Sequence, residues 1–100
     1  MINRADLLKN RLDSDTIEID GVGIIEVRAL NRHEAHQVQS ANDTATSERL
    51  ILRFGVVEPA LTESEIVAWM AASPAGEIER VSNRIAELSG IGEGAGKSKV

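Results

Sequence analysis

The hydrophobic pattern of this chain changes its period once, near Leu30, and that change restricts the fold more than any other feature. Before it, residues 17–19 and 25–29 alternate apolar and polar side chains, which is typical of strands with one buried face. Residues 20–23 between them contain two glycines and predict a hairpin turn. After it, apolar residues recur at spacings of three and four, which indicates helices. We therefore expect an α+β fold that is mostly α.

The predicted hairpin needs a cover, because an isolated two-stranded sheet is only marginally stable in water. Its apolar face would carry Ile17, Ile19, Ile25 and Val27. We expect these side chains to rest on the helices or on a sheet of another chain. The free edge of the hairpin offers a second route to a partner, since it could pair with a strand of another protein or of a second copy.

Capping signals divide the rest of the chain into helices. Asn31 with Glu34, and Thr62 with Glu65, have the three-residue spacing of capping boxes. Ser73-Pro74 indicates a boundary between two helices, with Ser73 as the N-cap of the second helix and Pro74 as its first residue. The chain after the hairpin is therefore predicted to hold about four helices.

Other end signals complete the expected architecture. Asn3 predicts the cap of a short N-terminal helix with Leu7 and Leu8 on its apolar side. Gly55 is predicted to follow a helix end as a C′ residue, and Gly90 is predicted to stop the last helix. Residues 1–90 would form a single domain. Residues 91–100, which are rich in glycine, alanine, serine and lysine, would form a flexible C-terminal tail.

Composition excludes several classes of function. The chain of 100 residues has 16 acidic and 11 basic residues, and its net charge of -5 disfavours binding to nucleic acid. It contains no cysteine, which removes disulfides and thiolate chemistry. Charged residues interrupt the N-terminal apolar run, which therefore resembles neither a signal peptide nor a membrane span. We expect a soluble, intracellular protein that binds no membrane.

Two motifs resemble catalytic or ligand sites, and neither fits its pattern. Gly96-Lys97-Ser98 matches the end of a phosphate-binding loop, but the required first glycine falls on Ile91. His33 and His36 lie three residues apart and lack an evident third metal ligand. Paired glutamates lie at helix starts, where the helix dipole accounts for them. We expect no enzymatic activity, no cofactor and no metal.

The remaining candidates are apolar surfaces that could bind another protein. Trp69 and Phe54 are the only aromatic residues, and tryptophan is common both in cores and at interface hot spots. The last helix carries an apolar seam that could pack internally or mediate self-association. The predicted protein-binding residues are Leu50, Ile51, Phe54, Trp69, Met70, Ile78, Val81 and Ile85.

Several segments resemble the tail assembly chaperones of actinobacterial siphophages and prophages. They are VEPALTESE at 57–65, AWM at 68–70, AGEIE at 75–79, IAELSG at 85–90, and VRALNR at 27–32 after the hairpin. The similarity covers nearly the whole chain and is strongest from residue 50 to residue 91.

This resemblance implies a role in building a phage tail. Proteins of the family bind the tape measure protein, with tail tube subunits as a further expected partner, before the tail polymerises. The chain would then act in the cytoplasm of the bacterial host and be absent from the mature virion. The family supplies no residue-level binding site to carry over.

Two other kinds of protein stay open at the level of sequence. A structural tail or head-tail connector subunit would persist in the virion. A small regulator could use the two helices around Ser73-Pro74 as a helix-turn-helix, although Glu77 and Glu79 would then approach phosphates.

Overall fold

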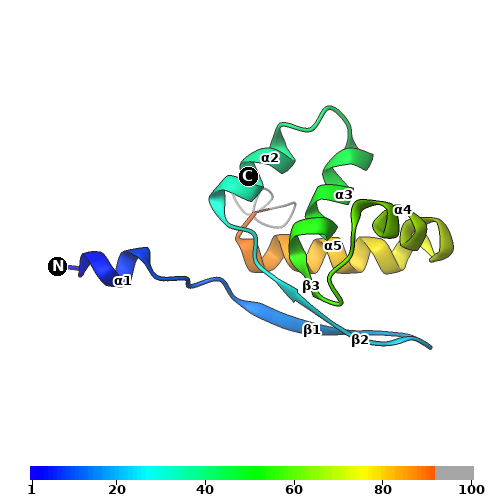
Figure 1. The fold of residues 1–100 in the computed structure, drawn as a ribbon, viewed down its shortest axis with the longest axis horizontal. Helices are drawn as coiled ribbons and strands as arrows, with labels where there is room; N and C mark the ends of the chain where they lie inside the picture. Colours follow the sequence, from blue (N-terminus) through cyan, green and yellow to red (C-terminus); the bar gives the residue numbers. More distant parts are fainter. Residues whose placement is uncertain (92–100) are drawn as a thin grey trace, which may run out of the picture.

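The computed structural model describes residues 1–91 of the chain (Figure 1). Its elements are α1 (Arg4–Leu8), β1 (Ser14–Ile19), β2 (Gly23–Arg28), α2 (Arg32–Gln39), α3 (Thr44–Gly55), β3 (Val56–Glu58), α4 (Glu63–Ala72) and α5 (Ala75–Ser89). The predicted α+β, mostly helical class is confirmed, with a short N-terminal helix and hairpin followed by four helices. The flexible tail was predicted for residues 91–100. Of these, only Ile91 belongs to the described residues, and residues 92–100 lie outside them.

The sheet has three antiparallel strands in the order β1-β2-β3. β1 and β2 form the predicted hairpin, with Ile17 opposite Ile25 and Ile19 opposite Gly23. β3 was not predicted, and it pairs with β2 through Val27 opposite Val56. The hairpin therefore has one of its two edges covered by a later segment of the same chain.

The core lies where the helices meet the sheet. α5 contacts β1 and β2 on one side and α3 on the other, and is thus the central helix (Figure 1). The apolar face of the hairpin rests on this core as expected. Ile19 and Val27 are buried, while Ile17 and Ile25 are partly buried against them. The largest fully buried side chains among residues 1–91 are Leu52, Ile66, Ile85, Val27 and Val81.

Local hydrogen bonds confirm most of the predicted helix starts. Both capping boxes form, one between Asn31 and Glu34 and the other between Thr62 and Glu65. The Asn3 side chain accepts a hydrogen bond from the Ala5 N–H at the start of α1. The N-cap of α3 was not predicted: the Asp43 carboxylate accepts from the Thr46 N–H at 2.7 Å.

The prediction for Ser73-Pro74 was wrong in detail. Pro74, in extended conformation, is itself the N-cap of α5 and no side chain caps that helix. Ser73 ends α4 instead, and its Oγ donates to the Trp69 carbonyl at 2.6 Å. The hydroxyl therefore stabilises the last turn of α4 and not the first turn of α5.

The two glycines predicted to end helices have different roles. Gly90 ends α5 as expected; it has a left-handed conformation, with φ of 74°, and the Ile91 N–H donates to the Ala86 carbonyl behind it. Gly55 is the last residue of α3 and has no positive φ, so it is not a left-handed C′ residue. A Cβ on Gly55 would lie only 2.5 Å from Cδ1 of Ile85. Glycine is required there because α3 crosses α5 closely.

α1 lies apart from the rest of the fold, at the far left of Figure 1. It buries none of its residues, and Leu7 and Leu8 are 52% and 70% exposed. The predicted apolar side of α1 is therefore present, but it is exposed to solvent and does not pack against the core. This helix and the segment that joins it to β1 extend the molecule to 49 Å along its longest axis.

Candidate functional site

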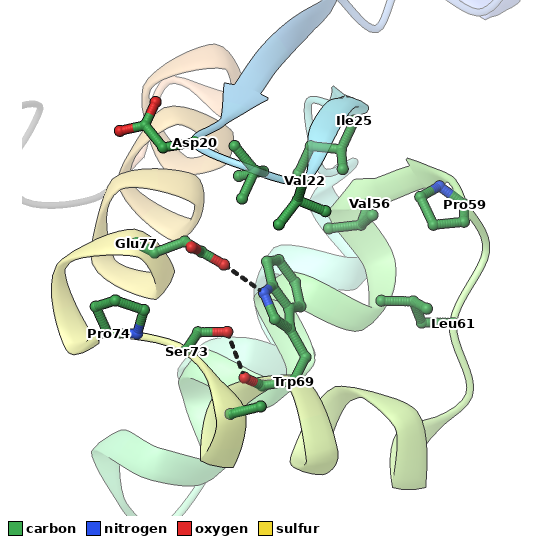
Figure 2. Close-up of a pocket in the computed structure, with 12 residues that line it drawn as sticks. Asp20, Val22, Ile25, Val56, Pro59, Leu61, Trp69, Ser73, Pro74 and Glu77 are labelled. Atoms are coloured by element: carbon green, nitrogen blue, oxygen red, sulfur yellow. Dashed lines mark hydrogen bonds between the residues drawn. The ribbon is translucent and has the colours of Figure 1, made fainter.

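An apolar groove of about 500 Å³ opens beside Trp69, and we call it the Trp69 groove (Figure 2). Four parts of the chain form it: the hairpin turn with the strand ends beside it, β3 with the segment that follows it, α4, and the first turn of α5. Its lining residues are Ile19, Asp20, Val22, Ile25, Val56, Pro59, Leu61, Trp69, Ala72, Ser73, Pro74 and Glu77.

The hairpin turn supplies one wall of the groove. Gly21 and Gly23 have positive φ values of 78° and 144°, which other residues rarely adopt. The Val22 N–H donates to the Ile19 carbonyl at 2.9 Å and closes the turn. Val22 is therefore held between two glycines at the tip, facing the groove and 80% exposed. An apolar side chain so exposed at a turn would gain from being covered.

Trp69 occupies the middle of the groove, and two hydrogen bonds hold it in place (Figure 2). Its indole Nε1–H donates to Oε2 of Glu77 at 2.8 Å, so the polar edge of the ring is satisfied. Its carbonyl accepts from Ser73 Oγ. Because α5 fixes the polar edge, the apolar part of the ring remains available beside Val22 and Val56.

The charged residues of the Trp69 groove are acidic. Asp20 and Glu77 line it. No lysine or arginine is among the lining residues that the described part of the chain contributes. Ser73 Oγ and Oε2 of Glu77 already form hydrogen bonds with Trp69. The groove can therefore bind an apolar segment, and a basic residue beside that segment would be favoured over an acidic one.

The eight residues predicted to bind protein do not form one surface. Ile78, Val81 and Ile85 are buried in the core, so the seam of α5 packs internally and is not accessible for self-association. Leu50, Ile51, Phe54, Trp69 and Met70 are half-buried against that core. Trp69, Met70 and Leu50 open onto three different hollows of the surface. Of the eight residues, only Trp69 lines the groove.

Sequence reasoning missed most of the groove. Val22 carried a signal, because a valine between two glycines in a predicted turn has no local structural role. Val56 and Leu61 carried none, since their position depends on the pairing of β3 with β2. Leu7 and Leu8 were predicted to form the apolar side of a short helix. That this side is exposed to solvent was not predicted.

Other kinds of site are not seen in the described part of the chain. Within residues 1–91, no group of three or more histidine, aspartate or glutamate side chains could hold a metal ion. The His33 ring lies 3.4 Å from the amide nitrogen of Gln37, its neighbour one turn along α2. No helix formed by those residues is long and apolar enough to cross a membrane.

Comparison of the chain with known protein families, with curated proteins and with solved structures gave no match. The geometry of the groove and the resemblance of the sequence segments are therefore the basis for a functional proposal.

Proposed function

We propose that this chain is a binding protein without catalytic activity, and that it acts as a phage tail assembly chaperone. The single observation that supports a binding role is the Trp69 groove, an apolar hollow whose central side chain is fixed by Glu77. The resemblance of residues 57–65 and 75–79 to tail assembly chaperones gives the partner, the tape measure protein, with tail tube subunits as a second partner.

The chemistry of the groove suits such a partner. A tape measure protein is a long, largely helical chain whose apolar seams are exposed until the tail tube encloses it. An apolar helix face could enter the groove and cover Trp69 and Val22. A groove of this size would bind one short stretch of helix, which favours a contact that tail assembly can reverse.

The test is co-purification of the tape measure protein with the wild-type chain and with groove variants. Trp69→Ala should weaken binding about tenfold or more, equivalent to about 1.4 kcal/mol, because a buried tryptophan is a frequent interface anchor. Ala72→Glu, at an exposed position of the groove, should do the same by placing a carboxylate there. Circular dichroism would establish that both variants fold.

Val67→Ala is the matched control, because Val67 is an apolar residue of α4 that is 48% exposed and does not line the groove. It should bind as the wild type does. If folded Trp69→Ala and Ala72→Glu retain full binding, the groove is not the contact.

The proposed site of action is the host cytoplasm, with the chain released before the virion is complete. Mass spectrometry of purified virions should then find no copies of this chain. Its presence at a fixed ratio to tail tube subunits would favour a structural or connector subunit instead.

A further inference from the structure

The first twelve residues, which we call the N-terminal arm, expose a set of large apolar side chains. α1 buries none of its residues, and the segment from Lys9 to Leu12 is also exposed. Exposed apolar residues scattered singly are ordinary, but here they are concentrated in one short segment. They are Met1, Ile2, Leu7, Leu8 and Leu12.

The arm and the rest of the described chain carry opposite charge. The arm has three basic residues, Arg4, Lys9 and Arg11, and one acidic residue, Asp6. Residues 13–91 have six basic and fourteen acidic residues. The Trp69 groove reflects this difference, since its charged lining residues are Asp20 and Glu77. A basic segment with leucines is thus complementary to the groove in both charge and polarity.

The arm points away from the groove of its own chain. Figure 1 shows the arm at the end of the hairpin where β1 begins, at Ser14. The groove is lined by Val22, which lies in the turn at the other end of the hairpin. The six residues of β1 separate the two by about 20 Å. The arm extends in the direction opposite to the groove, so a groove on another molecule is the one it is placed to meet.

We propose that the N-terminal arm of one copy binds in the Trp69 groove of a second copy. Leucine side chains of α1 cover Trp69 and Val22, and the basic residues of the arm lie beside Asp20 and Glu77. If each of two copies inserts its arm into the other, the assembly closes as a two-fold dimer. A partner segment that uses the same groove would have to displace the arm.

The outer edge of the sheet is a weaker route to self-association. β1 is an outer strand in the sheet that residues 1–91 form, but side chains of α5 already lie against it. Arg80 donates to the Glu18 carbonyl at 2.7 Å, and Arg84 bonds the Asp15 carboxylate at 2.8 Å. The first contact engages a backbone carbonyl that a pairing strand would need, and the second holds a long side chain against the same strand.

Sedimentation equilibrium of the full chain tests the proposal without any partner protein, so its failure is distinct from failure of the proposed function. The wild type should associate over a range of about 1 µM to 1 mM. Leu8→Glu in the arm and Val22→Glu in the groove should each weaken association at least tenfold, because each places a carboxylate in an apolar contact. Both positions are exposed, so neither change should unfold the monomer.

Val67→Glu is the charge-matched control and should associate as the wild type does, since Val67 lies outside the groove. Added salt should weaken association, because screening reduces the attraction between arm and groove. A wild-type chain that stays monomeric throughout the range, or association unaffected by both Leu8→Glu and Val22→Glu, would overturn the proposal.

Disulfide trapping identifies which groove the arm enters, and the absence of native cysteine makes it selective. A chain with Leu8→Cys, mixed with a longer tagged chain carrying Ala72→Cys, should form a disulfide-linked pair on mild oxidation. Replacing Ala72→Cys by Val67→Cys should abolish that product. A third chain would carry both Leu8→Cys and Ala72→Cys. If it formed only an intramolecular disulfide, the arm would fold back onto its own groove, which contradicts exchange between copies.

Discussion

The pair formed by Arg28 and Glu34 connects the end of β2 to the start of α2. Arg28 donates two hydrogen bonds to the Glu34 carboxylate, at 2.9 and 2.7 Å, and the Glu34 side chain is 16% exposed. These bonds from Arg28 lower the pKa of Glu34 below its ordinary value of 4.5, against the opposing effect of burial. Glu34 also accepts from the Asn31 N–H as part of a capping box.

Glu34→Gln should lower the free energy of unfolding at pH 7 by about 1–2 kcal/mol, because it removes a charged, bidentate hydrogen bond that is mostly shielded from water. Since the folded pKa is below the unfolded one, this stabilisation is complete above pH 4.5 and is lost as the pH falls through the folded pKa. Urea unfolding at several pH values should therefore show the wild type and the variant converging in acid.

Glu65→Gln is the matched control, because Glu65 occupies the same place in the other capping box and has no ion pair among residues 1–91. Glutamine keeps the acceptor in both boxes. A difference from the wild type that persists unchanged at low pH in Glu34→Gln would mean that the charge of Glu34 does not stabilise the fold.

The packing of α3 against α5 depends on Gly55, where the two helices cross closely. Gly55→Ala should destabilise the fold by about 1–3 kcal/mol, because the added methyl group overlaps the fully buried side chain of Ile85. Gly76→Ala in α5 meets nothing within 4 Å and should be neutral or stabilise by up to about 1 kcal/mol. Urea unfolding of both variants measures the contrast, and equal stability would show that the helices can separate without cost.

The elements themselves were largely predictable from sequence, since most of their signals are local. The capping boxes at Asn31 and Thr62 depend on residues three apart, and both formed as expected. β3 depends on pairing with β2, which is distant in sequence, and a run of three residues gives little pattern of its own. Gly55 was assigned the wrong role because its neighbour Ile85 lies thirty positions away along the chain.

At the scale of the whole molecule, the core and the N-terminal arm are separate. Leu52→Ala should cost about 2–5 kcal/mol, because Leu52 is fully buried where α3 meets the core. Leu8→Ala should change stability by less than about 0.5 kcal/mol when measured at dilution, where copies do not associate. Thermal or urea unfolding compares the two. A similar loss in both variants would place the arm in the fold of the monomer.

The candidate site was less predictable than the fold, because it belongs to no single element. Helical spacing marked Trp69, which lines the groove, and the same spacing marked Ile78, Val81 and Ile85, which face inward and are buried. An apolar stripe alone does not reveal whether the neighbouring element covers it. The groove exists only where the hairpin turn, the segment after β3 and two helices come together, and that arrangement is a property of the folded chain.

The position of Trp69 has one further consequence. It is the only tryptophan of the chain, and it lies in the groove with its Nε1–H bonded to Glu77. Its fluorescence therefore reports on this groove alone, without a label. Indole emission shifts to shorter wavelength when water around the ring is replaced by apolar groups, so the intrinsic spectrum of the unmodified protein records occupancy of the groove directly.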